Sequence, residues 1–416
     1  MTNATTDRAG ELRAQLADEL IANGHITMSA VEAAFRTVPR HEFVPAGTSL
    51  EEAYNAAVAV VTKRDEHGVA ISSISAPFIQ ARMIEQAQLA SGMCVLEIGS
   101  GGYNAALLAE VVGPQGRVAS MDIDPEVTER ASTRLEATGY GGRVTVVLAD
   151  AEHGAPNYGI FDAVIVTVGA WDISPTWTEQ LAGDGRLVVP LRMNGITRSI
   201  AFRRANDHLV STSAEVCGFV PMQGDGEHAE RVFHLPDGHG HSLHLRFDSG
   251  APENCSLLDG ILATERREVW SGVTIKHGVS FADLHLWFAC FLPGFCKMAA
   301  DEGTELAQAE RGSWFPFAVV RGGGFAYLAV RQALGGAGVE FGARAYGPHS
   351  EQAATAMVEQ IQAWDRQARS GPEPTFAFWP RGSRAELAEG TAVLEKTYGR
   401  VTISWPAGRA TPEHHP

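Results

Sequence analysis

The feature that most constrains the fold is an alternation of strand-like and helix-like segments that begins at Met93. Short aliphatic or β-branched runs lie at 94–98, 118–123, 144–148, 163–168 and 186–191. Helical patterns lie between them, as at 105–112 and 125–138. Strands that alternate with helices predict a mostly parallel, doubly wound α/β sheet. In such sheets ligands bind beyond the carboxyl ends of the strands.

The flanking regions have other patterns. Two short helices are predicted ahead of the sheet, at 9–23 and 29–38, the second with Ser29 as its N-cap. Pro39 ends this helix, and the stretch to Val69 is predicted to be loop. After about Gly195 we expect strands at 199–203, 315–320, 325–331 and 401–405, a hairpin turn at 321–324 and a helix at 351–367. These elements predict a second, α+β domain.

The composition excludes several classes of protein. With 33 Lys and Arg against 49 Asp and Glu, the formal charge of the 416 residues is −16, which disfavours nucleic acid and anionic lipid as partners. The start lacks a secretory pattern, and the longest apolar stretch, 284–295, is too short to span a membrane. The five cysteines form no C-x-x-C pair and the clustered histidines no H-E-x-x-H motif. We expect a cytoplasmic protein without a metal site.

A glycine-rich turn follows the first strand of the predicted sheet. Val95-Leu96-Glu97-Ile98-Gly99-Ser100-Gly101-Gly102 leads into a helix, and Asp122 ends the next strand. A strand, a glycine turn, a helix and an acid about 20 residues on form the general plan of a nucleoside site, with the acid on the ribose hydroxyls. A purely structural turn is the alternative. Asp150 ends the third strand, where it either meets an adenine amino group or caps a helix.

Two further segments are more specific. Val31 to Pro45 and Ser73-Ile74-Ser75-Ala76-Pro77 resemble the N-terminal signature and the T-I-S-x-P segment of the protein-L-isoaspartate O-methyltransferase family. The resemblance covers about Val31 to Leu191 and implies a Rossmann-like class I methyltransferase domain that uses S-adenosyl-L-methionine and releases S-adenosyl-L-homocysteine. It also implies that the Ser75 hydroxyl contacts the substrate carboxylate, although an isolated Ser-x-Pro also forms simple turns.

The resemblance assigns the donor site residue by residue. The cofactor-binding residues it implies are Ser73, Ile74, Glu97, Gly99, Ser100, Gly101, Gly102, Asp122, Ile123, Asp150, Ala151, Thr167 and Val168. The glycine turn is one residue shorter than the family's form, and the family's G-D-G is Ala149-Asp150-Ala151 here. We expect residues 1–80 to form the helical and substrate-loop region, 81–213 the donor-binding core, and 214–416 a C-terminal domain for peptide recognition.

The length of the chain bears on its substrate. The whole chain looks like a long branch of the family that is associated with ribosomal peptides, including lanthipeptides, the FxLD system and graspetides; the segments 62–68, 169–172 and 403–406 suggest this branch. That resemblance implies methylation of an aspartate in a modified precursor peptide, which leads through the ester to succinimide and isoaspartate. Repair of isoaspartyl proteins is one alternative. A non-catalytic module that keeps the nucleoside pocket is another, and the presence of Ser75 and Asp122 argues against it.

Overall fold

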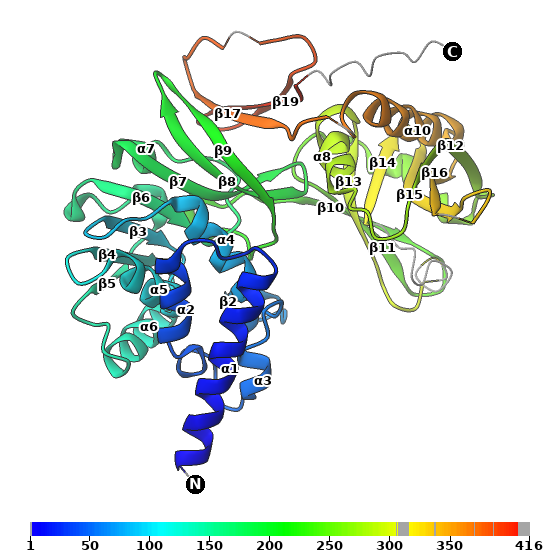
Figure 1. The fold of residues 1–416 in the computed structure, drawn as a ribbon. Helices are drawn as coiled ribbons and strands as arrows, with labels where there is room; N and C mark the ends of the chain where they lie inside the picture. Colours follow the sequence, from blue (N-terminus) through cyan, green and yellow to red (C-terminus); the bar gives the residue numbers. More distant parts are fainter. Residues whose placement is uncertain are drawn as a thin grey trace, which may run out of the picture.

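The computed structural model describes residues 2–304, 306, 316–336, 338–369, 371–385 and 387–406. In this part of the chain the strands form a 10-stranded sheet, a 7-stranded sheet and a small 2-stranded one (Figure 1). The first large sheet carries the N-terminal helices. The second stands to its side with its own helices.

The first sheet has a parallel half, built from the predicted strands. These are β3 (Cys94–Ile98), β4 (Arg117–Asp122), β5 (Val144–Leu148), β6 (Phe161–Val166) and β7 (Leu181–Met193). The bounds of β3 and β5 agree with the prediction, and the doubly wound α/β class is confirmed. Because β3 pairs with β4 on one side and β6 on the other, the strand order reverses at β3. The carboxyl ends around this point are where doubly wound sheets bind ligands.

Both faces of this half are covered. Alternate residues point to opposite faces, so Val95 packs with the N-terminal helices while Leu96 packs on the other side, and both are fully buried. The covering helices and short 3₁₀ turns are α1 (Thr2–Ala22), α2 (Ser29–Thr37), η1 (Arg40–Glu42), α3 (Leu50–Ala53), α4 (Pro77–Ala87), α5 (Tyr103–Val112), α6 (Pro125–Ala137), η2 (Ala151–His153), η3 (Pro156–Tyr158) and α7 (Pro175–Glu179). No described helix is long and apolar enough to cross a membrane.

The N-terminal region differs from the prediction in two places. Met28, not Ser29, is the N-cap of α2, and no side chain of its own caps the helix. The Glu85 carboxylate of α4 accepts the Met28 backbone N–H at 2.7 Å instead, so the cap comes from a distant segment. The expected loop up to Val69 contains η1, α3 and β1 (Val60–Arg64), and β1 pairs with β2 (Ala70–Ile74) in the small sheet. Such distant partners leave no local signal.

The first sheet continues past its parallel half. Strands β8 (Ile196–Ala205) and β9 (His208–Val216) follow β7 as antiparallel hairpins. Asn194 and Gly195 form the β7–β8 turn with φ of 49° and 85°, as a two-residue hairpin turn requires. Then β17 (Thr375–Pro380), from near the C-terminal end, pairs with β9 and brings β19 (Gly399–Ser404) and β18 (Ala392–Glu395) into the same sheet.

This pairing changes the expected division of the chain. Residues 375–404 lie in the first sheet, beside β9, although the sequence placed 214–416 in one C-terminal unit (Figure 1). Edge pairing joins strands by backbone hydrogen bonds that any suitable strand can make, so the residue pattern does not indicate which sheet a strand joins. The chain therefore leaves the first sheet after β9 and returns to it near its end.

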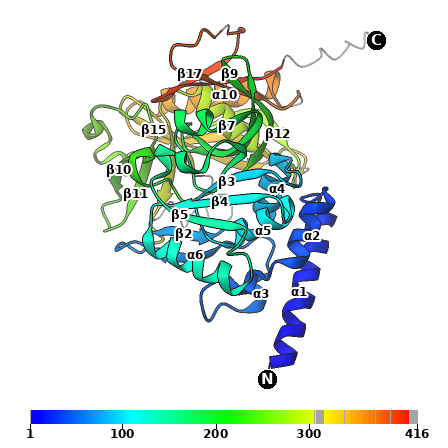
Figure 2. The same cartoon turned by 90° about the vertical axis from the view of Figure 1, so that its left-hand side faces the viewer.

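The second sheet lies between these two passages. Its strands are β10 (Arg231–Pro236), β11 (Ser242–Phe247), β12 (Arg267–Ile275), β13 (Phe295–Ala300), β14 (Phe317–Arg321), β15 (Gly324–Gln332) and β16 (Val339–Tyr346). Of its helices, α8 (Ala282–Phe291) buries Trp287 and α10 (Ser350–Gln367) buries Trp364. Figure 2 shows α10 in the upper part of the view, away from α1. Short turns η4 (Gly224–Gly226), η5 (Cys255–Leu258) and η6 (Ile261–Ala263) connect these elements. Gly322 and Gly323 form the predicted β14–β15 turn; Phe315 lies outside the described residues.

Candidate functional site

The glycine turn lies where the sequence predicts it, between β3 and α5. Gly99 has a φ of 99°, and a Cβ there would lie 2.5 Å from Thr167 Oγ1, so only glycine fits. Thr167 itself donates to the Gly99 carbonyl at 2.9 Å. A Cβ at Gly101 would lie 2.8 Å from Ile74 Cδ1. The turn is thus packed between the end of β6 and the serine loop, defined as residues 73–77.

Glu97, at the base of the turn, is fully buried. Asn104 Nδ2 donates to one carboxyl oxygen at 2.8 Å, the Ser120 hydroxyl donates to the other, and Ser100 Oγ lies 2.8 Å from Ser120 Oγ. Burial raises the pKa of Glu97 to about 7, although the bonds from Ser120 and Asn104 oppose the shift. Glu97 therefore joins β3, β4, α5 and the glycine turn, and it does not line the pocket described below.

Asp122 lies at the carboxyl end of β4, opposite the turn. Its oxygens accept the backbone N–H groups of Ser100 and Asp124, each at 3.0 Å. Burial raises its pKa, against which these backbone bonds act. Each carboxylate oxygen can accept a further hydrogen bond, so the group can still bind a diol while its position is fixed from both sides.

The serine loop is held from below by Arg40, which is fully buried. Its guanidinium donates to the Ser75 carbonyl at 2.8 Å, the Ala53 carbonyl at 2.7 Å and Gln80 Oε1 at 2.9 Å. It also lies 4.8 Å from the ring centre of Tyr103. Burial lowers the pKa of Arg40 to about 10, which leaves it charged at neutral pH. The loop backbone is therefore fixed by a cation, whereas the half-buried Ser75 hydroxyl has no hydrogen-bond partner among the described residues.

Asp150 caps η2, as its structural alternative predicted. Its Oδ1 accepts the Glu152 N–H at 2.9 Å, and its Oδ2 accepts the Asp225 N–H at 2.8 Å. The second bond joins Asp150 to residues 217–228, which we call the covering segment. This segment also pairs with Gly169: the Gly169 N–H donates to Val220 at 2.8 Å, and the Met222 N–H donates to Gly169 at 3.1 Å. The covering segment thus lies across the strand ends.

A hollow of about 50 Å³ lies at these strand ends. Its lining residues are Ile71, Ile98, Gly99, Met121, Asp122, Ile123, Ala151, Val168, Pro221, Met222 and Gln223. It includes five of the sequence-predicted donor residues, Gly99, Asp122, Ile123, Ala151 and Val168. The others surround it: Ser73, Ile74, Ser100, Gly101 and Gly102 shape the turn and the serine loop, Glu97 and Thr167 support the turn, and Asp150 caps η2.

The hollow continues as apolar surface. Whole small molecules need roughly 300–1,000 Å³, so this hollow accounts for only part of a nucleoside-sized ligand. Beside it, Ile123 and Leu148 are 38% and 57% exposed, and Leu148 pairs with Asp122 across the strands. An acid next to exposed aliphatic side chains fits a nucleoside, whose ribose is polar and whose base is flat and apolar. The chemistry of the strand ends therefore suits S-adenosylmethionine.

Lys63 and Arg82, two cations near the serine loop in the sequence, are already paired. Lys63 Nζ lies 2.7 Å from both Asp124 and Glu126, and Arg82 lies 3.2 Å from Glu215. Lys63 thereby ties the small β1–β2 sheet to the start of α6. These side chains stabilise the framework of the site, and their charges are balanced by the protein itself.

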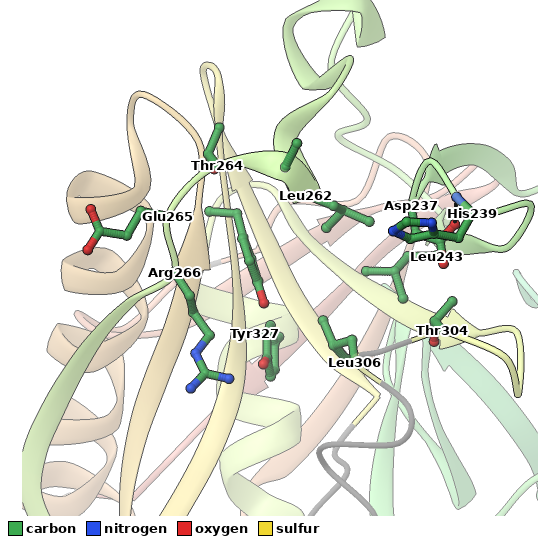
Figure 3. Close-up of a pocket in the computed structure, with 12 residues that line it drawn as sticks. Asp237, His239, Leu243, Leu262, Thr264, Glu265, Arg266, Thr304, Leu306 and Tyr327 are labelled. Atoms are coloured by element: carbon green, nitrogen blue, oxygen red, sulfur yellow. Dashed lines mark hydrogen bonds between the residues drawn. The ribbon is translucent and has the colours of Figure 1, made fainter.

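A larger hollow, of about 650 Å³, lies in the second sheet (Figure 3). Leu243 and Tyr327 are buried at its base, while Asp237, Glu265 and Arg266 are its charged residues. No group of three or more metal-binding side chains occurs in the described part of the chain, and here His239 is a wall residue. We place the reaction at the smaller hollow, because it has the glycine turn and a fixed acid at the switch in strand order.

Most side chains of the apolar stretch 284–295 belong to the core. Leu284, Leu286, Trp287 and Phe288 of α8 are buried, as is Phe317 of β14. Trp314 lies outside the described residues. These buried side chains join α8 to α10 and the first sheet.

Together, the doubly wound sheet, the glycine turn and the acid that ends β4 define a class I, S-adenosylmethionine-dependent methyltransferase. Residues 11–227 match the family model described as protein-L-isoaspartate(D-aspartate) O-methyltransferase. The chain belongs to this family of carboxyl methyltransferases.

Individual relatives agree with this assignment. A protein-L-isoaspartate O-methyltransferase of Hyperthermus butylicus is 35% identical over 224 residues, which is 52% of this chain and 90% of the relative. One of Ignicoccus hospitalis is 39% identical over 182 residues, 44% of this chain and 82% of the relative. A solved protein-L-isoaspartate O-methyltransferase shares the fold with a TM-score of 0.50 and 23% identity, over 88% of this chain and 96% of its own. That likeness in fold extends beyond residue 227.

Several residues around the hollow carry no clear signal in the sequence. Pro221, Met222 and Gln223 come from a loop whose course periodicity does not predict, although the family match to residue 227 includes them. Ile71 lies in β2, between the expected loop, which ends at Val69, and the serine loop, which begins at Ser73. Arg40 was part of the N-terminal signature, but its buried position depends on contacts with residues up to 40 positions away. In the sequence, Arg40 is recognisable only as a charged residue next to Pro39.

Proposed function

We propose that the protein transfers a methyl group from S-adenosylmethionine to the carboxylate of an isoaspartyl residue in a peptide or protein. The observation that carries this proposal is the serine loop, whose backbone is fixed by the buried Arg40 while the Ser75 hydroxyl is left without a partner among the described residues. The names of the relatives support isoaspartate as the substrate.

The residues divide the work in a simple way. When bound, S-adenosylmethionine supplies an electrophilic methyl group, and the products are a methyl ester and S-adenosylhomocysteine. Asp122 accepts hydrogen bonds from the ribose, and Gly99 and Val168 line its pocket. Ser75 donates to one oxygen of the substrate carboxylate and leaves the other free to react. A carboxylate is already ionised at neutral pH, so orientation and exclusion of water suffice and no general base is required.

A second candidate substrate is an ordinary aspartate in a ribosomally made, modified peptide. It is favoured by the junction between the end of β6 and the C-terminal strands, where Trp171 contacts Lys396. Segment 169–172, which suggests the peptide-tailoring branch, lies in this junction, outside the hollow. The methyl ester formed on such an aspartate would be attacked by the next backbone amide nitrogen. Its proton leaves with the methoxy group as methanol, and a succinimide ring remains.

The test uses two synthetic peptides that differ only in isoaspartate or aspartate at one position. With enzyme and S-adenosylmethionine, mass spectrometry is expected to show the mass of one added CH₂ on the isoaspartyl peptide alone. Transfer to the aspartyl peptide, or later net loss of water from it, would favour the second candidate. Modification of neither peptide would contradict the first proposal.

Ser75→Ala tests the role of the hydroxyl. Loss of one hydrogen bond to a charged group costs about 1.5–3 kcal/mol, so we expect kcat/KM for the isoaspartyl peptide to fall roughly 10- to 100-fold. The Kd for S-adenosylhomocysteine should not change. Ser72→Ala is a matched control, because Ser72 lies three residues before Ser75, in β2, and its hydroxyl is bound to Thr62. Equal effects of the two substitutions would contradict the assigned role.

A further inference from the structure

The turn between β18 and β19, residues 396–399, contacts the donor side of the first sheet. It is closed by a hydrogen bond from the Lys396 N–H to Gly399 at 2.9 Å. It lies far beyond residue 227, where the family match ends. The Tyr398 N–H donates to Asp172 at 2.7 Å, and a hydrogen bond with Glu152 raises the pKa of Tyr398 to about 12. Both acceptors follow strand ends that flank the pocket.

Lys396 makes the most specific contact of this turn. The side chain is buried, and its ammonium nitrogen lies 3.2 Å from the ring centre of Trp171. The same nitrogen donates to the Arg192 carbonyl at 2.7 Å. A cation above a tryptophan face is attracted by the negative potential of the ring, and more strongly where water is excluded. The Trp171 ring and the Arg192 carbonyl therefore fix the position of Lys396, and Lys396 fixes theirs.

The other face of Trp171 is covered by His228. The two rings are stacked with their centres 3.7 Å apart and an interplanar angle of 7°. Because the imidazole already covers one face, the ammonium of Lys396 must lie on the other. The three side chains form a stack in which one tryptophan separates a residue of the C-terminal turn from a residue of the covering segment. His228 is fixed further by a 2.7 Å hydrogen bond with the Asp248 carbonyl.

This stack leads directly to the pocket. Trp171 follows Val168 and Gly169, of which the first lines the hollow and the second pairs with the covering segment. His228 follows Met222 and Gln223, which also line the hollow. Fixing Trp171 against His228 therefore fixes both segments that contribute to the lining. The buried charge is costly, since burial lowers the pKa of Lys396 to about 7 against the opposing effect of Asp172 and Asp248.

We propose that Lys396 is a positioning residue for the donor site: it holds Trp171 against His228 and thereby keeps residues 221–223 in place as a wall of the pocket. The inference rests on the proposed donor pocket. It assigns the C-terminal turn a part in methyl-donor binding, in addition to its part in the sheet.

The test measures binding of S-adenosylhomocysteine by calorimetry to the full chain. Lys396→Met keeps the bulk of the side chain and removes its charge, and we expect Kd to rise roughly 10-fold, which corresponds to about 1.4 kcal/mol. Lys396→Arg, which keeps a cation over the ring, should restore most of the affinity. Lys276→Met, at an exposed lysine after β12, is the control and should leave Kd unchanged.

Two readouts separate positioning from mere stability. Tryptophan fluorescence of Lys396→Met should differ from that of wild type. Because the chain has 8 tryptophans, a Trp171→Phe background assigns the signal: there the difference should vanish. His228→Ala should weaken binding by a similar factor. Combined with Lys396→Met it should add little, because the two side chains act through one ring. If Lys396→Met does not fold, the affinity of His228→Ala decides the question.

The outcomes are distinct. If Lys396→Met and His228→Ala both bind S-adenosylhomocysteine as wild type does, or if their effects simply add, the inference is wrong. If Asp122→Ala also binds as wild type does, the donor pocket itself is misplaced and the proposed function fails with it. Loss of binding by Asp122→Ala alone overturns only the role of Lys396.

Discussion

The two hollows of this protein differ in size and in how their polar groups are held. The smaller one, about 50 Å³, is framed by Asp122, whose oxygens both accept backbone hydrogen bonds, and rests on the buried Glu97. The larger one, about 650 Å³, has charged residues such as Glu265 and Arg266 exposed at its edge. Volume alone therefore does not identify a reaction site. Polar groups whose positions are fixed from several elements mark it better, since preorganised groups need not rearrange when they act.

The largest effect should follow from loss of the cation beneath the serine loop. Arg40→Met leaves the buried carbonyls of Ala53 and Ser75 without their donor. We expect the free energy of unfolding to fall by about 3 kcal/mol, measured by urea denaturation. Arg36→Met removes a partly exposed arginine paired with Asp18 and Glu32, and should change stability by less than about 0.5 kcal/mol. Similar losses in both variants would show that the small hollow is not held as described.

Asp122→Ala is the next most severe change and addresses donor binding. Two hydrogen bonds from a ribose to a charged acceptor are together worth roughly 3 kcal/mol, so we expect S-adenosylhomocysteine to bind at least about 100-fold more weakly. Calorimetry measures the loss of affinity. Asp122→Asn keeps the shape of the side chain, and its affinity should lie between those of wild type and Asp122→Ala. If Asp122→Ala binds S-adenosylhomocysteine as tightly as wild type, the smaller hollow is not the donor site, and the two hollows differ in form but not in function.

Titration of Glu97 should make the free energy of unfolding depend on pH. This effect is smaller than the two above, and its sign is defined. The pKa of Glu97 is raised from 4.5 to about 7 in the folded protein. A group with a raised pKa binds a proton more tightly when folded, so its contribution to stability is complete below the unfolded pKa and is lost as the pH rises through about 7. Between about pH 5 and pH 7, wild type should lose about 2 kcal/mol relative to Glu97→Gln. Denaturation of both proteins across this range measures the difference; parallel curves would contradict the raised pKa.

The smallest effect is expected at the larger hollow. His239 and Arg266 are exposed at its wall, and replacing both by alanine should change stability by less than about 0.5 kcal/mol. The Kd for S-adenosylhomocysteine should stay within about 2-fold of wild type, because no contact between these side chains and the donor pocket exists among the described residues. A clear loss of donor affinity would remove the distinction between the two hollows.

Local patterns predicted the backbone around the candidate site. The strand 94–98, the glycine turn and Asp122 follow one another within 30 residues, and each carries its own signal: periodicity, backbone freedom and an acid at a strand end. Asp150 shows the limit of such signals. As a strand-end acid it fitted both an adenine contact and a cap, and the structure shows the cap.

Residues that act over long distances were not predictable. Arg40 and Gln80 are 40 positions apart, and Lys396 and Arg192 are 204 apart. A lone arginine or lysine in a sequence resembles a surface charge, since nothing local distinguishes a buried cation from a solvated one. The assignment of 375–404 to the second unit failed for the same reason, because strand pairing is decided by the edge that β9 leaves open.

The return of β17, β18 and β19 to the first sheet also has a consequence for biosynthesis. Synthesis proceeds at about 5–20 residues per second, and amino-terminal parts generally fold first. Here the nascent amino-terminal half emerges with β9 as an open edge, and its complement, 375–404, is translated near the end. Pairing across such a separation in sequence is slow, and an unpaired edge invites association with other chains meanwhile. Translation must therefore almost finish before the newly made enzyme is protected against aggregation.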